Sequence, residues 1–307
     1  MSSDGGLLKW LIESGAEVSN AIHIAPSALG GLGAFCDISV KRRQSLFRVP
    51  SSCILTSKVA CESPLGRAVI AAATDLLADD DTLRTDPRWL DGRVLLWIYI
   101  AIGRKDVSTR FGPYLASLPD DSPEPTCWSS ALRKELAATP AGVALDEARD
   151  FVEDLYTRFA SRLPAALGEA LVPRGCLASA AELLWARGMC VSRAFPGILA
   201  AGACGEAAPE HTDASGQVVL RQTADGMVGG GGGSSESGPG CLLPFFDVLN
   251  HRSGALVTCT AVPPGRADSG VTFSSDTALG AGAELCNNYS NRSNEELLFC
   301  CEIPNLP

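Results

Sequence analysis

The amino-acid sequence predicts an α+β fold in which a long helical insertion splits the β-sheets of one domain. Strand-and-turn patterns fill residues 21–63 and return over 241–307, while residues 64–199 between them have helical spacing. An N-terminal helix is expected within residues 1–20. Since neither β-rich part is long, we expect the two parts to join across the insertion.

The first β-rich part follows a short amphipathic helix. Within residues 4–15, Leu7, Leu8, Leu11 and Ile12 fall on one helical face, and Gly15 ends the pattern. Short apolar runs then alternate with turn residues, which predicts a small antiparallel meander. Its strands are expected at Ile22–Ile24, Ala34–Ile38 and Ser45–Val49.

Helical spacing dominates the insertion, where prolines and glycines separate the helices. Helices are expected at Ala68–Leu77, Leu90–Ile102, Thr126–Ala138, Leu145–Leu163 and Ala178–Arg193. After the insertion, residues 200–240 include the glycine run Gly229–Gly233 and a serine-rich stretch. Such a segment buries too little apolar area to offset its backbone entropy, so we expect a disordered insert.

The second β-rich part is predicted to end in a helix. Strands are expected at Leu256–Val262, Gly270–Phe273 and Glu284–Asn287. In Ser293–Cys301, a serine N-cap is followed three residues later by Glu296, which completes a capping box.

Composition excludes several classes of protein. The 307 residues include 25 Lys and Arg against 35 Asp and Glu, a net charge of −10 that does not suit nucleic-acid binding. No apolar stretch reaches the ~18 residues of a membrane span. The 12 cysteines show neither Cys-x-x-Cys pairs nor zinc spacing, and no secretory signal is visible. We therefore expect an intracellular protein with reduced cysteines and no metal, although a cysteine-based redox protein stays open.

Gly31-Leu32-Gly33 precedes a predicted strand and has two interpretations. Adjacent glycines let the backbone approach a ligand closely, but the same residues also suit a hairpin turn. A dinucleotide fingerprint is excluded, because it requires a third glycine where Cys36 stands and a helix that does not follow.

Three further groups are candidates for chemistry. Asp247, Asn250 and His251 end an apolar run, and Tyr289 lies in a polar turn. Each of these also fits a polar cap or a half-buried side chain. Ser192-Arg193 closes a predicted helix, where an arginine is favoured by the helix dipole. A serine hydrolase is disfavoured, since no Gly-x-Ser-x-Gly elbow is present.

In series these segments resemble the SET domain, in the subgroup that includes the Rubisco large-subunit methyltransferase. Gly31–Ile38 and Leu46–Pro50 resemble its Gly-x-Gly strand start and its Val-Pro strand end. Ser192–Phe195 matches its Ser-Arg-Ala-Phe segment, and Leu243–His251 matches Pro-x-x-Asp-x-x-Asn-His. Tyr289–Leu298 matches the start of its Tyr-Gly-x-Lys-Ser-Asn-Glu-Glu-Leu-Leu helix. The resemblance covers residues 21 to 303.

The resemblance implies transfer of a methyl group from S-adenosylmethionine to an amine, with lysine of a non-histone protein as the expected acceptor. Tyr289 would be the catalytic residue that orients the amine. The expected cofactor-binding residues are Gly31, Leu32, Gly33, Ser192, Arg193, Asp247, Asn250, His251 and Tyr289, with His251 acting through its backbone. The expected substrate channel is lined by Ser192, Arg193, Phe195, Tyr289 and Cys301.

Three departures from the subgroup keep alternatives open. Gly30 stands where a glutamate is frequent, and Cys301 stands where the channel has a second aromatic residue. The chain stops at Pro307, so we expect either that the helical substrate-binding domain is absent or that this is a truncated form. A SET-like binding module with weak or no catalysis is therefore one alternative. A histidine methyltransferase is another, since the resemblance to this subgroup also implies histidine acceptors. We expect a monomer without nucleic-acid or membrane partners, and the sequence does not distinguish cytoplasm, nucleus and plastid.

Overall fold

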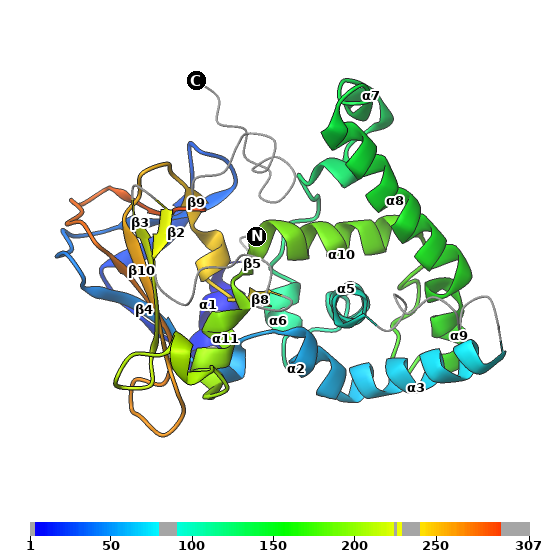
Figure 1. Cartoon of the computed structure of the whole chain (residues 1–307), viewed down its shortest axis with the longest axis horizontal. Coiled ribbons are helices and arrows are strands. Elements are labelled where there is room, and N and C mark those ends of the chain that lie inside the picture. The colour runs from blue at the N-terminus through cyan, green and yellow to red at the C-terminus, as the bar shows by residue number, and fades with distance from the viewer. Residues whose placement is uncertain (1–3, 80–90, 224–225, 229–239, 290–307) are drawn as a thin grey trace. The chain divides into compact units, whose positions relative to one another are not determined.

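The computed structural model describes residues 4–79, 91–223, 226–228 and 240–289. These residues divide into two compact units (Figure 1). Unit 1 contains the described residues of Met1–Ile54 and Ala194–Arg292, and unit 2 contains those of Leu55–Arg193. Each unit is described by itself.

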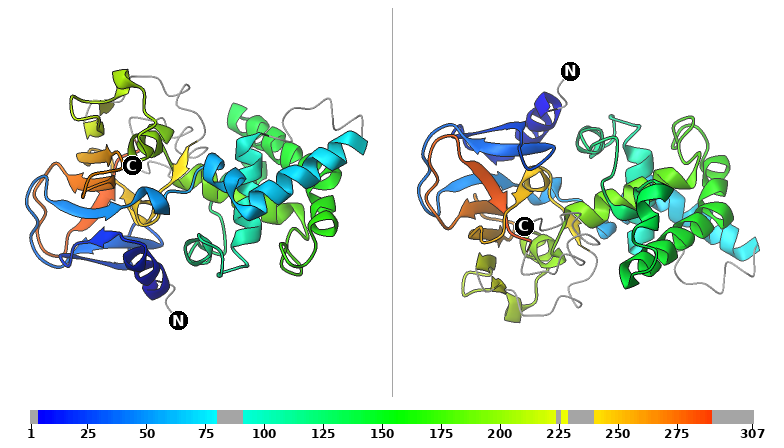
Figure 2. Two further views of the ribbon diagram at one scale, coloured as in Figure 1. Left: turned by 90° about the horizontal axis from the view of Figure 1, so that it is seen from below. Right: turned by 90° about the horizontal axis from the view of Figure 1, so that it is seen from above.

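Unit 1 is built on two main sheets (Figures 1 and 2). Within the described residues, the larger sheet has the order β1-β4-β11-β10-β6-β7, and the smaller has the order β2-β3-β12-β9. The strands of the larger sheet are β1 (Glu17–Val18), β4 (Ser45–Val49), β6 (Val218–Thr223), β7 (Gly226–Val228), β10 (Val257–Val262) and β11 (Gly270–Ser275). Those of the smaller are β2 (Ile22–Pro26), β3 (Leu32–Cys36), β9 (Asn250–His251) and β12 (Glu284–Asn287).

Both sheets join the two β-rich parts, as the sequence predicts. In the larger sheet β4 pairs antiparallel with β11, and in the smaller β3 pairs antiparallel with β12. The predicted meander is wrong in one respect, because β4 pairs with β1 and β11 and not with the hairpin of β2 and β3. Local alternation specifies a strand but not its partner.

An aromatic cluster forms the core of unit 1. Phe47 of β4 stacks on Phe273 of β11, with ring centroids 5.0 Å apart. The edges of Phe245 and Phe246 meet Phe47 at 4.6 Å each. All four side chains are buried. Aromatic pairs in these arrangements stabilise beyond their burial alone, so the cluster ties the β4–β11 seam to the segment that leads into β9.

Two helices and a two-stranded ladder also belong to the described part of unit 1. The predicted N-terminal helix is present as α1 (Asp4–Glu13), with Leu7 and Leu11 buried. A short ladder joins β5 (Ala194–Phe195) to β8 (Cys241–Leu242). Helix α11 (Gly197–Cys204) has buried residues Leu199, Ala200, Gly202 and Ala203.

The disorder predicted for all of residues 200–240 is wrong for part of it. Helix α11 extends through the start of this segment, and β6 pairs with β10 over five residue pairs. Val218 and Leu220 point into the core, which is the period-2 pattern of a half-buried strand. The glycine run dominates the composition of the segment and hides this short strand. The run itself, Gly229–Gly233, lies outside the described residues.

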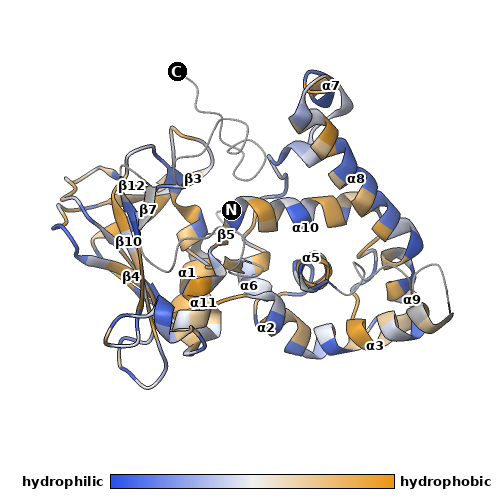
Figure 3. Ribbon diagram, viewed as in Figure 1, coloured by the Kyte–Doolittle hydropathy of each residue, from blue (hydrophilic) through white to orange (hydrophobic). Residues whose placement is uncertain are grey.

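Unit 2 is helical. Its described residues form the helices α2 (Ser57–Glu62), α3 (Pro64–Asp79), α5 (Gly92–Gly103), α6 (Gly112–Leu115), α7 (Ser130–Lys134), α8 (Pro140–Arg158), α9 (Leu163–Leu167) and α10 (Ala180–Arg193). Helix α5 is buried along most of its length and packs against α2 and α10. Helix α8 carries hydrophilic residues along its length (Figure 3), and its buried residues are few.

Helix α3 begins at Pro64 and not at the predicted Ala68, and two other helices of unit 2 also differ from the predicted spans. In place of a helix over 126–138, a 3-10 turn (Pro125–Cys127) precedes the shorter α7. Thr126 is held by the carboxylate of Glu124, which competes with helical backbone pairing. Helix α8 begins earlier than predicted, at Pro140, because Thr139 caps it by accepting the N–H of Gly142. The helix predicted over Ser293–Cys301 lies outside the described residues.

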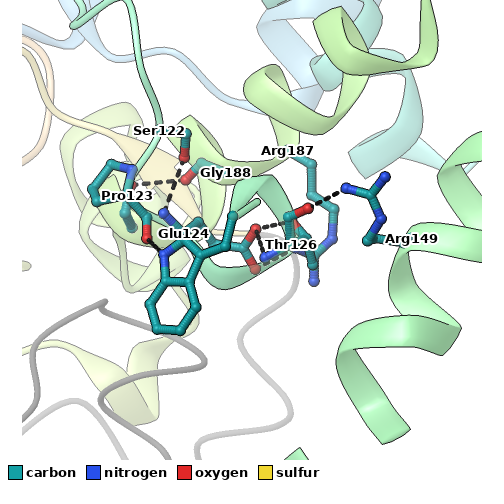
Figure 4. A network of polar contacts seen from close by, with 9 residues as sticks. Ser122, Pro123, Glu124, Thr126, Arg149, Arg187 and Gly188 are labelled. Atoms are coloured by element: carbon teal, nitrogen blue, oxygen red, sulfur yellow. Dashed lines mark hydrogen bonds and ion pairs between the residues drawn. The ribbon is translucent and has the colours of Figure 1, made fainter. Parts of the chain in front are cut away.

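A buried polar network anchors α10 (Figure 4). Arg187 of α10 donates to Glu124 Oε1 at 2.7 Å, and Glu124 is fully buried. Arg149 of α8 donates to the carbonyl of Thr126 at 2.6 Å. Burial raises the pKa of Glu124, and the Arg187 guanidinium opposes that rise. The segment around Glu124 is thereby fixed against α8 and α10.

Candidate functional site

The smaller sheet of unit 1 gathers most of the residues singled out in the sequence. Its hairpin turns through Gly30 (φ +113°) and Gly31 (φ +58°), a region that favours glycine. The N–H of Ser27 donates to the carbonyl of Gly31 at 3.0 Å and closes the turn. The hairpin-turn interpretation of Gly31 is therefore correct, and the turn delivers Leu32 and Gly33 to the start of β3.

Asn250 links three strands of this sheet. Strand β9 runs parallel to β12, with Asn250 opposite Cys286. Asn250 Nδ2 donates to the carbonyl of Leu32 at 2.9 Å and to Glu284 Oε1 at 2.8 Å. One amide group thus joins β3, β9 and β12, although Asn250 is 218 residues from Leu32 and 34 residues from Glu284 in the sequence.

Gly33 is required by a side chain that lies against it. A Cβ placed on Gly33 would lie 2.3 Å from Glu284 Oε1 and 3.1 Å from Asn250 Nδ2. Glu284 Oε1 cannot readily withdraw, because it also accepts a hydrogen bond from Ser27 Oγ at 2.8 Å. The Glu284 carboxylate therefore lies close against this glycine, while the predicted approach of a ligand to the glycine backbone stays a prediction.

His251 and Tyr289 form the second half of the site. The backbone N–H of Tyr289 donates to His251 Nδ1 at 3.1 Å, and the two rings stack with centroids 5.1 Å apart. His251 is 9% exposed, and burial lowers the pKa of its imidazole. Because Nδ1 accepts this hydrogen bond, the neutral ring carries its hydrogen on Nε2. The His251 side chain thus positions Tyr289, a role that the sequence prediction of a backbone contact did not include.

The phenol of Tyr289 is oriented by the segment that leads into β9. Tyr289 Oη donates to the carbonyl of Leu249 at 3.3 Å. The neighbouring Asn288 is buried and donates from Nδ2 to the carbonyl of Ala255 at 3.2 Å. Asn288 and Tyr289 are therefore both held by side-chain hydrogen bonds.

The remaining predicted residues divide between the units. Asp247 lies in the 3-10 turn η6 (Phe246–Val248), and Phe195 of β5 meets the edge of the Phe246 ring at 5.7 Å. Ser192 and Arg193 end α10 in unit 2, where Ser192 Oγ donates to the carbonyl of Gly188 at 2.7 Å. Their predicted place beside the cofactor stays a prediction. Cys301 lies outside the described residues.

Glu284 was not predicted as a site residue. It stands at the start of β12 before the buried Leu285 and Cys286. In the sequence it is only an acidic residue at the start of an apolar strand, a position that is most often solvated and so did not single it out.

Comparison with solved structures identifies the fold. A crystal structure of the SET domain of LSMT bound to lysine and AdoHcy matches with a TM-score of 0.66 and 15% identity, over 97% of this chain and 56% of that one. Rubisco LSMT bound to sinefungin and monomethyllysine matches with a TM-score of 0.67 and 16% identity, over 99% and 57%. The chain has a SET-domain fold of the LSMT type. The resemblance inferred from the sequence motifs is thereby confirmed for the fold.

A curated relative of this SET-domain chain points the same way. The protein-lysine N-methyltransferase EFM1 of Saccharomyces cerevisiae is 24% identical over 330 residues, which cover 95% of this chain and 48% of the yeast protein. The chain therefore spans about half the length of this relative. No family model matches the chain.

Among the described residues, no group of three or more His, Cys, Asp or Glu side chains could hold a metal ion. The described helices include none that is long and apolar enough to cross a membrane.

Proposed function

We propose that this SET-domain chain is a protein-lysine N-methyltransferase that uses S-adenosylmethionine. The observation that carries the proposal is the convergence of Leu32, Asn250, His251 and Tyr289 at the ends of neighbouring strands of one sheet. The similar structures of LSMT are bound to lysine, AdoMet or AdoHcy, and the yeast relative is a protein-lysine N-methyltransferase.

The residues of the site fit the amino-acid end of this cofactor. Asn250 uses Nδ2 for Leu32 and Glu284, and within the described residues its Oδ1 makes no hydrogen bond. That oxygen can accept from an ammonium group. At the hairpin, nothing lies within 4 Å of where a Cβ of Gly31 would stand, so the turn leaves space for a ligand. We assign Gly31, Leu32, Gly33 and Asn250 to the methionine end, and the backbone of His251 to the adenine.

Tyr289 is assigned to the reacting centre. When bound, the cofactor supplies an electrophilic methyl group on a sulfonium. The amine nitrogen forms the new N–C bond while the C–S bond breaks, and the amine must be neutral to attack. For lysine, with a pKa of about 10.4, neutrality at pH ~7.4 costs about 4 kcal/mol. The phenol oxygen of Tyr289, fixed by its bond to Leu249, can orient an amine N–H and accept weak C–H···O contacts from the methyl group.

We further propose a non-histone protein as the substrate and an intracellular, monomeric enzyme. Support for the substrate comes from the structural similarity to Rubisco LSMT, which is named for a non-histone protein. Ser192, Arg193, Phe195 and Cys301 are the residues proposed for the substrate channel.

A labelled-methyl transfer assay tests the proposed function. The chain is incubated with S-adenosylmethionine carrying a labelled methyl group and with cell extract, and mass spectrometry locates the labelled residue. We expect label on lysine and a loss of at least about tenfold in rate for Tyr289→Phe, since positioning is removed. The matched control is Tyr156→Phe, a half-buried tyrosine of α8 in unit 2, which should retain the rate.

Each other outcome has a distinct meaning. Label on histidine would replace the lysine assignment with the histidine alternative. Cofactor binding without any transfer would favour a SET-like binding module. An unchanged rate in Tyr289→Phe would remove Tyr289 from the reacting centre.

A further inference from the structure

The carboxylate of Glu284 lies in the candidate cofactor site and has hydrogen-bond donors but no cationic side chain as a partner among the described residues. Its Oε1 accepts hydrogen bonds from Ser27 Oγ and Asn250 Nδ2, each at 2.8 Å. Within the described part of the chain, no Lys, Arg or His forms an ion pair with this half-buried carboxylate. A carboxylate without a counter-ion at this position attracts a cationic ligand.

The groups around Glu284 are acceptors. The Asn250 amide N–H bonds and the Ser27 hydroxyl are already directed at Glu284 or at the Leu32 carbonyl. What remains for a ligand is Asn250 Oδ1, the second carboxylate oxygen of Glu284 and the other lone pair of the Leu32 carbonyl. A set of three acceptors with one negative charge fits an ammonium group, which has three donors and no acceptor, and disfavours a carboxylate.

The position of this carboxylate is built into the fold. Gly33 provides the space for Glu284, since any Cβ there would lie 2.3 Å from Oε1. The register of β12 against β3 pairs Glu284 with Phe35, and the parallel pairing of β9 places Asn250 beside it. Three strands thus fix the acceptors before a ligand arrives, which lowers the ordering cost of binding.

We propose that Glu284 binds the α-ammonium group of the cofactor's methionine moiety, together with Asn250 Oδ1 and the Leu32 carbonyl. This assignment rests on the proposed function, because it concerns the same cofactor. The charge of the Glu284 carboxylate selects for the amino-acid end of the cofactor. Glu284 is thereby a specificity-determining residue.

Binding calorimetry with two ligands and Glu284→Gln tests the assignment. S-adenosylhomocysteine has the α-ammonium group, whereas 5′-methylthioadenosine lacks the whole amino-acid end. Glutamine keeps the shape and the side-chain oxygen that Ser27 and Asn250 bind, but it removes the charge. We expect the affinity of Glu284→Gln for S-adenosylhomocysteine to fall about 10- to 100-fold, as for loss of a charge-assisted hydrogen bond. Its affinity for 5′-methylthioadenosine should stay unchanged.

A second variant separates the charge from the local bonding. Ser27→Ala removes one hydrogen bond to Glu284 and keeps the carboxylate, so its affinity for both ligands should stay within about threefold of the wild type. Equal binding of S-adenosylhomocysteine by wild type and Glu284→Gln would overturn the assignment. So would a parallel loss of both ligands, which would indicate a structural role. A wild-type chain that binds neither ligand would instead overturn the proposed function, and the assignment with it.

Discussion

Gly33→Ala should destabilise unit 1 by forcing the Glu284 carboxylate out of its place. The new Cβ would stand 2.3 Å from Glu284 Oε1, which is held by Ser27 and Asn250. Moving that oxygen away breaks two hydrogen bonds to a charged group. At the lower end of their range, about 1.5 kcal/mol each, the expected loss in free energy of unfolding is about 3 kcal/mol.

Equilibrium urea unfolding of four variants measures this effect. Glu284→Ala removes the obstructing carboxylate, so adding Gly33→Ala in that background should cost no more than about 1 kcal/mol, the residual contact being with Asn250 Nδ2 at 3.1 Å. Gly280→Ala is the matched control, since Gly280 is exposed and nothing lies within 4 Å of its Cβ position. An equal cost of Gly33→Ala in both backgrounds would refute the packing of Glu284 on Gly33.

Two further predictions concern charged and titrating groups. Arg187→Met should destabilise unit 2 by about 3–5 kcal/mol near neutral pH, because it leaves buried Glu124 without its partner. Burial raises the pKa of Glu124 above its ordinary value, so the carboxyl is already neutral in mild acid and urea unfolding there should show a smaller loss. An equal loss in acid and at neutral pH would contradict this reason. Burial lowers the pKa of His251, so the unfolded chain binds this proton more readily and the contribution of His251 to the stability of unit 1 is lost as pH falls below about 6.5. In His251→Asn the side-chain oxygen can replace Nδ1 as acceptor and does not titrate. The melting temperature of this variant should therefore change less with pH than that of the wild type between about pH 5 and about pH 7. An unchanged slope of melting temperature against pH would show that another group titrates.

The ordered series of motifs made the fold predictable, while strand pairing had to come from the structure. Tyr289 could be placed with His251 because both segments matched one family in order. What brings them together is the parallel pairing of β9 with β12, through Asn287 opposite His251. No local periodicity contains that information, since pairing partners lie far apart in sequence.

Glu284 illustrates what the sequence leaves open. Its importance comes from contacts with Ser27 and Asn250, which are 257 and 34 residues away. A single acidic residue beside a turn is most often solvated, so its position alone predicts an ordinary strand end. Strand β6 was missed for another reason, because the adjacent glycine-rich composition outweighed the short pattern of Val218 and Leu220.

Titration of the purified chain with S-adenosylmethionine, followed by calorimetry, tests the central claim most directly. The acceptor groups of Leu32, Asn250 and Glu284 and the fixed Tyr289 predict saturable binding of one cofactor per chain. The absence of binding at millimolar cofactor would contradict the cofactor site, and with it the proposed methyl transfer.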